Sequence, residues 1–133
     1  MKKLIVIAVM VSIFLCSVVV IAADPVSMTL RQGIVKGYYY TETIADSATG
    51  ANVKIPPMGL DGSRITCTII AGSNTGKFQF TTSSDAAVQA DTATWIDWAK
   101  GAVTGTDYDV LTSQVTGLRG VSTSGEIKIE IVY

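Results

Sequence analysis

Hydrophobic and polar residues alternate along most of the patterned segments of this chain, as they do in β-strands that have one buried face and one wet face. The clearest run is the last one, "EIKIEIVY" at residues 126–133, in which Ile127, Ile129 and Ile131 share a face. Charged residues, Lys128 among them, occupy most of the opposite face. This period of two predicts a final strand that closes a β-rich domain.

A second alternating region lies in the middle of the chain. In "GSRITCTIIAG" (residues 62–72), Ile65, Cys67 and Ile69 share one face, and in "KFQFTT" (residues 77–82), Phe78 and Phe80 do the same. The segment between them, "SNTG", is a turn signal. We therefore expect two strands joined as a β-hairpin by a loop of about five residues at 72–76.

The remaining segments give weaker signals. Residues 108–111 and 115–121 predict two short strands, and "VSMTLRQGIVKGYYYTETI" predicts one or two more, with a break at Gly33 or Gly37. Residues 45–62 are loop-like because they contain two prolines and several glycines. Only "SSDAAVQAD" suggests a helix, which Ser84 could cap and which is too short to be stable without tertiary support.

About seven short strands separated by Gly, Ser, Asn and Thr turns predict an all-β domain. We expect an antiparallel β-sandwich, Ig-like or jelly-roll-like, although a small, partly open barrel gives nearly the same pattern. The expected core residues are Trp95, Ile65, Cys67, Ile69, Phe78, Phe80, Leu118, Ile127, Ile129 and Ile131.

The first residues have the form of a secretory signal peptide. Two lysines precede an uncharged apolar run at residues 4–23, which ends in small residues at Ala23. We expect cleavage after Ala23, with an uncleaved, helical signal anchor as the alternative. A lipoprotein is disfavoured because Leu15, which is not small, precedes Cys16. The prediction is a single exported domain at 24–133, periplasmic, extracellular or on the cell surface, that meets a membrane only if residues 1–23 are retained.

Charge and composition exclude several function classes. Without Lys2 and Lys3, eight basic residues face eleven acidic ones, and this net charge of −3 without basic clusters argues against nucleic-acid binding. The chain has no histidine, which removes the usual catalytic triads and the commonest metal ligand. Cys67, the only cysteine left after cleavage, is expected to be a buried, inert thiol. We therefore predict no enzyme activity, no metal site and no cofactor, and we interpret "DYD" at residues 107–109 as solvated turn carboxylates.

The aromatic residues are the more serious candidates for binding. In "DTATWIDWAKGAV" (residues 91–103), a strand would place Trp95 and Trp98 on opposite faces, with Trp95 as the core plug. An exposed Trp98 beside Asp97 could stack on a sugar or anchor a protein, and three consecutive tyrosines place at least one ring outward. The alternative is that both indoles only fill the core. The candidate binding residues are Trp98, Asp97, Tyr38, Tyr39 and Tyr40.

The stretch from about residue 62 to 132 resembles small β-rich proteins encoded among phage and prophage structural genes. The matching positions are Thr92, Ala93, Thr94, Trp95, Trp98, Gly101, Val103, Val115, Thr116, Leu118 and Arg119. The resemblance implies a virion accessory or decoration module without catalytic activity, which acts on a protein partner and could be a homo-oligomer. An export signal is a departure from such proteins. A secreted carbohydrate-binding or adhesin domain of a bacterial surface is the second hypothesis.

Overall fold

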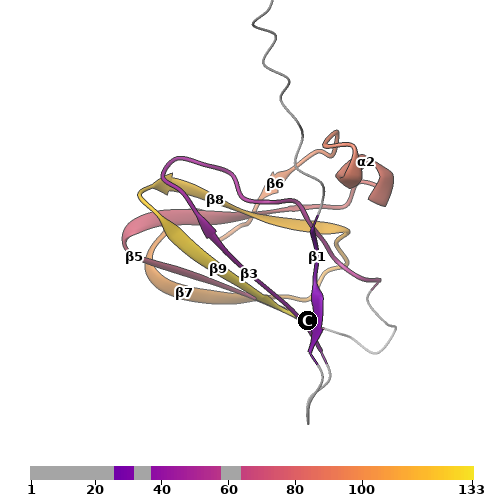
Figure 1. Ribbon diagram of the computed structural model, residues 1–133, viewed down its shortest axis with the longest axis horizontal. Coiled ribbons are helices and arrows are strands. Elements are labelled where there is room, and N and C mark those ends of the chain that lie inside the picture. The colour runs from indigo at the N-terminus through magenta and orange to yellow at the C-terminus, as the bar shows by residue number, and fades with distance from the viewer. Residues whose placement is uncertain (1–25, 32–36, 58–63) are drawn as a thin grey trace, which may run out of the picture.

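The computed structural model describes residues 26–31, 37–57 and 64–133, with the backbone alone at 29–31. These residues form nine strands and one short helix, arranged in a compact body (Figure 1). The elements are β1 (Val26–Ser27), β2 (Thr29–Arg31), β3 (Gly37–Ile44), β4 (Val53–Lys54), β5 (Ile65–Thr81), α2 (Asp85–Gln89), β6 (Ile96–Asp97), β7 (Val103–Leu111), β8 (Gly117–Ser124) and β9 (Ile127–Val132). Among them no helix is long and apolar enough to cross a membrane. The signal segment expected at residues 1–23 lies outside the described residues.

The strands form one hydrogen-bonded network in the order β1-β4-β8-β5-β9-β3-β2, with β6 and β7 on the other edge of β5. All the pairings are antiparallel except that of β1 with β4. The first part of β5 pairs with β7 and β9, and its last part pairs with β8 and β6. The network therefore has two layers that share β5. The predicted all-β, mainly antiparallel architecture is confirmed.

The central hairpin that the sequence predicts is not formed, because residues 65–81 are one continuous strand. At the expected turn, the β5–β7 register shifts between Ile70 and Thr75, and Gly72 takes a left-handed φ of 60°. Asn74 Nδ2 donates to the Glu126 carbonyl over 2.8 Å, which ties this bend to the turn between β8 and β9. The turn residues thus bend a strand and redirect it to new partners.

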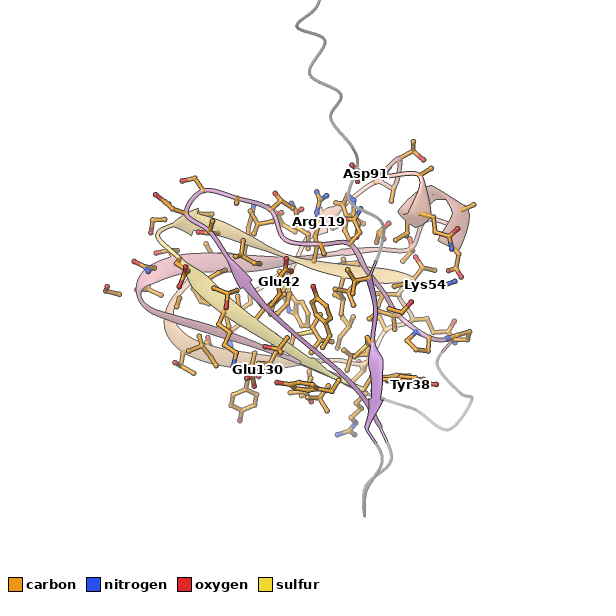
Figure 2. The ribbon with its side chains drawn as sticks, in the orientation of Figure 1. Tyr38, Glu42, Lys54, Asp91, Arg119 and Glu130 are labelled. Carbon is orange, nitrogen blue, oxygen red and sulfur yellow. The ribbon has the colours of Figure 1, made fainter. Side chains whose placement is uncertain are left out.

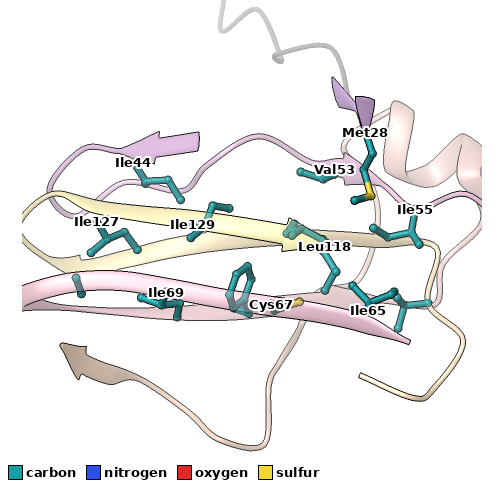
Figure 3. Close-up of a cluster of buried hydrophobic side chains, with 14 residues drawn as sticks. Met28, Ile44, Val53, Ile55, Ile65, Cys67, Ile69, Leu118, Ile127 and Ile129 are labelled. Carbon is teal, nitrogen blue, oxygen red and sulfur yellow. The ribbon is translucent and has the colours of Figure 1, made fainter. Parts of the chain in front are cut away.

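The core lies between the two layers and consists of aliphatic side chains that alternate along the strands (Figure 3). Ile65, Cys67, Ile69, Phe78, Leu118, Ile127, Ile129 and Ile131 are all buried. The layers are in close contact at Gly120 of β8, where an added Cβ would lie 2.6 Å from Ile44 Cδ1 and 2.9 Å from Ile129 Cγ2. Only glycine lets β8 approach the facing layer this closely.

The other expected elements are present with shifted ends. The strands predicted at 108–111 and 115–121 are the longer β7 and β8, and the final strand has the alternating burial that its sequence predicts. Ser84 caps α2 by accepting a hydrogen bond from the Ala87 N–H over 3.3 Å. The described part of the expected loop, residues 45–57, contains the short strand β4. Residues 58–62 of that loop and Gly33, one of the two expected breaks, lie outside the described residues.

Candidate functional site

Trp98 and the "DYD" segment, which the sequence treats as separate features, meet in the structure. The Trp98 indole N–H donates to Asp109 Oδ2 over 3.0 Å, and the ring packs against Phe78 with centroids 6.0 Å apart. A small pocket of about 20 Å³ between Trp98 and β7 is large enough for about one water molecule. Trp98 therefore packs partly buried against the core beside β7, which agrees with the alternative in which the indole is structural.

The two aspartates of β7 also bind their own strand. Asp107 Oδ1 accepts from the Tyr108 N–H over 2.8 Å and from Lys100 Nζ over 2.7 Å, and Asp109 Oδ1 accepts from the Val110 N–H over 2.7 Å. These contacts, with Lys100 first, lower the pKa of Asp107. The N–H groups of Tyr108 and Val110 on this edge strand are thus bonded to carboxylates, which disfavours pairing with a further strand there. These carboxylates remain partly exposed, as we expected, but they lie on a strand and not in a turn.

Trp95 lies outside the core cluster and is half-buried. Arg119 of β8 covers its ring, with Cζ 4.3 Å from the ring centroid. Trp98, and not the expected Trp95, is therefore the indole that packs against the core cluster. The reason is that β6 has only two residues, after which the chain turns. The backbone N–H of Trp98 then donates to the Phe78 carbonyl over 3.0 Å, and this contact brings the Trp98 side chain over the core.

Asp97 is exposed and belongs to a chain of polar contacts on the outer side of β5. It accepts from Lys77 Nζ and from Gln79 Nε2, each over 2.7 Å, while Gln79 Oε1 accepts from Arg119 Nε over 2.8 Å. The hydrogen bond from Lys77 is the first cause that lowers the pKa of Asp97. The Gln79 amide donates through its nitrogen and accepts through its oxygen. By binding the nitrogen, Asp97 turns the amide oxygen toward Arg119.

Arg119 also lines a pocket of about 210 Å³ that is bordered by residues 49–52 and by Asp91 in the turn after α2. In Figure 2 the labelled Arg119 and Asp91 side chains lie on the same side of the molecule. Asp91 lies on the rim, and its Oδ1 accepts from Asn52 Nδ2 over 2.9 Å. Sequence reasoning missed this site because its residues come from three segments that are far apart in the chain. The one local signal was Asp91, a residue type that tolerates the left-handed conformation, at the end of a short helix.

The three tyrosines have different environments. Tyr38 stacks on Tyr133, with centroids 5.8 Å apart and planes at 15°, and the Tyr40 hydroxyl donates to Glu42 Oε2 over 3.1 Å. Burial, followed by the charge of Glu42, raises the pKa of Tyr40. Tyr38 and Tyr40 pack against the core cluster, which leaves Tyr39 on the outer face of the sheet. The three residues are not one patch.

Tyr39 belongs to a regular grid on the outer surface of the layer formed by β7, β5, β9 and β3. The cross-strand registers give three rows, which are Val110–Thr66–Val132–Tyr39, Tyr108–Thr68–Glu130–Thr41 and Thr106–Ile70–Lys128–Thr43. We call these twelve residues the outer face. Four of its apolar side chains are more than a third exposed, and Tyr108 is 68 % exposed. The two charged members, Lys128 and Glu130, pair over 2.8 Å.

Cys67 and Phe80, which the sequence places in the core, differ in burial. Cys67 is buried, and burial first, with the charge of Asp109 second, raises the pKa of its thiol. A neutral buried thiol is a poor nucleophile. Phe80 is only partly buried at the margin of the core. Within residues 26–31, 37–57 and 64–133, no three His, Cys, Asp or Glu side chains are grouped as metal ligands.

Comparisons with known proteins add little to this geometry. No family model matches the chain, and no curated protein does. A chain from the solved structure described as "Bacillus endospore appendages form a novel family of disulfide-linked pili" is similar at 9 % sequence identity, over 79 % of this chain and 96 % of that chain. The TM-score is 0.28, which is too low to indicate a shared fold.

Proposed function

We propose that this chain is a non-enzymatic structural module that associates, through its outer face, with a second copy of itself in a surface or virion assembly. One observation carries the proposal: a continuous, nearly uncharged face of threonine, valine, isoleucine and tyrosine side chains, with Tyr108 at 68 % exposure. Four strands about 4.8 Å apart and three rows about 6.7 Å apart cover roughly 400 Å². Five of the twelve residues are apolar or aromatic, and the largest exposed apolar patch of a small protein is often functional.

The charges of the outer face favour a second copy as the occupant. Lys128 and Glu130 are two residues apart on β9, so a copy related by a two-fold axis can place Lys128 against Glu130 in both directions. A contact of roughly 400 Å² per partner is small compared with a stable dimer, which buries about 800 Å² per partner. Such a contact is therefore weak in a pair and becomes strong when many copies are arrayed.

A more specific form of this proposal is that the chain is a virion accessory or decoration protein. The resemblance of residues 62–132 to phage structural proteins supports it. The apolar run at residues 4–23 supports export from the cell, to the periplasm, the medium or the surface. The distribution of the protein between purified particles, surface fractions and medium tests this version. Recovery only as a free monomer in the medium contradicts it.

The self-association is tested by sedimentation velocity over a range of concentrations, on protein purified from cells that express the full chain. Val132→Glu is expected to abolish dimer formation, whereas Ile96→Glu, an equally exposed apolar residue on β6, is expected to leave it unchanged. Lys128→Glu is expected to weaken association, and the charge swap Lys128→Glu with Glu130→Lys is expected to restore it. Association that resists Val132→Glu refutes the proposed face.

A further inference from the structure

The pocket between Asp91 and Arg119 is separate from the outer face and shares no residue with it. It is lined by Thr49, Gly50, Ala51, Asn52, Asp91 and Arg119. The 48–50 segment is fixed beside β8, because the Gly50 N–H donates to the Gly120 carbonyl over 2.9 Å and the Ser122 N–H donates to the Ala48 carbonyl over 2.8 Å. One wall of the pocket is therefore a hydrogen-bonded part of the sheet.

Arg119 is held in place and still has unused donors. Trp95 supports the guanidinium from below, and Gln79 accepts from Nε. Among the described residues, no hydrogen bond involves either terminal nitrogen of the guanidinium. Those nitrogens carry four of the five N–H donors of an arginine. The side chain is thus pre-oriented, with most of its hydrogen-bonding capacity available for a ligand.

Asp91 faces Arg119 across the pocket without closing on it. A left-handed φ of 53° and the hydrogen bond from the nearly buried Asn52 fix the carboxylate. No ion pair within 4.0 Å joins Asp91 to Arg119 in the part of the chain that the structure describes. Two opposite charges therefore border the same pocket without forming an ion pair with each other.

The two charges select the chemistry of the ligand. An anion would be attracted by Arg119 and repelled by Asp91, and a cation would meet the reverse. A hydroxyl group satisfies both sides, because it can accept from the guanidinium and donate to the carboxylate. The volume of about 210 Å³ is smaller than that of a site for a drug-sized ligand, which starts near 300 Å³. We infer that this pocket binds one neutral sugar ring, whose adjacent hydroxyls bridge Arg119 and Asp91.

The inference is tested by titrating the protein, purified from cells that express the full chain, with glucose, galactose and N-acetylglucosamine. Two-dimensional NMR spectra recorded during each titration are the readout. The indole N–H of Trp95, which is buried and has no acceptor among the described residues, reports on the ring beneath Arg119. At least one sugar is expected to shift this signal and that of Arg119 Nε–H, with a Kd near a millimolar. The Trp98 indole N–H, bonded to Asp109, is the internal control and is expected to stay constant.

Two variants complete the test. Asp91→Ala and Arg119→Leu are each expected to weaken sugar binding at least tenfold, because each removes a charged partner of a hydroxyl. Glu126→Gln, at an exposed turn carboxylate elsewhere, is the matched control. If a variant does not fold, the NMR shifts of the unmodified protein still show whether a sugar binds in the pocket.

Three results would overturn the inference. The first is the absence of any shift at about 10 mM of each sugar, tenfold above a millimolar Kd. The second is unchanged sugar affinity in folded Asp91→Ala, and the third is a preference for acetate or sulfate over the sugars. Val132→Glu, which tests the outer face, leaves this pocket intact, so the two proposals fail independently.

Discussion

Removal of the Asp109 carboxylate tests whether Trp98 is held as a structural plug. Asp109→Ala leaves the half-buried Trp98 indole N–H and the Val110 N–H without their acceptor. Water can replace the contact at Val110, which lies on the open edge of β7. The loss at Trp98, a hydrogen bond to a charged group, is expected to destabilise the domain by about 1.5–3 kcal/mol. For a domain of this size, the melting temperature would fall by roughly 6–15 °C.

Two further variants make this prediction specific. Asp107→Ala breaks the exposed contact with Lys100, and it should lower the melting temperature less than Asp109→Ala does. Asp109→Asn keeps one carbonyl oxygen that can accept from the Trp98 indole, so its stability should lie between those of the wild type and Asp109→Ala. Thermal unfolding followed by near-ultraviolet circular dichroism, which senses Trp98 directly, measures all three variants. Equal losses in Asp109→Ala and Asp107→Ala would refute the role given to the indole.

Three other predictions follow from burial and charge. Cys67 should react with a thiol reagent only at the rate of global unfolding, which mass spectrometry in increasing urea can measure; fast labelling in buffer would contradict its burial. Ile129→Ala should cost about 2–5 kcal/mol in chemical denaturation and Ile129→Val about 0.5–1.5 kcal/mol, because the side chain is fully buried; equal losses would argue against a tight core. The fold lowers the pKa of Asp97 below its ordinary value of 3.8. The ionised carboxylate therefore contributes fully to the free energy of unfolding above pH 3.8, and this contribution is lost as the pH falls below that value. Between about pH 4 and pH 2, stability should therefore fall less steeply in Asp97→Asn than in the wild type. Parallel slopes would show that the Lys77–Asp97 ion pair does not cause the loss of stability in acid.

The sequence predicts the strands better than it predicts their connections. Alternation places Ile127, Ile129 and Ile131 in the core because one face of a strand is set by local spacing alone. The "SNTG" segment has the residues of a turn, and its bend in β5 depends on Asn74 reaching Glu126, 52 positions away. The conformational preferences of a short segment give no information about a contact with a residue so far away in the chain.

The same limit applies to the candidate site. Whether Trp95 or Trp98 covers the core depends on where the chain turns after β6, and the aspartate that receives the Trp98 N–H lies eleven positions further along the chain. The pocket requires Asn52, Asp91 and Arg119 to meet, and no spacing in the sequence relates them. Charge and composition led only to expectations about which chemistries to disfavour, and they pointed to no particular residues of the pocket.

Because β5 belongs to both layers, neither layer has a complete set of neighbours without the other. Pulling β7 and β9 away from residues 65–70 would also disturb the bend at Gly72 and the docking of β8 on residues 75–81. Partial opening of one half is therefore costly, and we expect amide protons in both layers to exchange through a single concerted event. We therefore expect heat or denaturant to unfold the two layers together, as one cooperative unit.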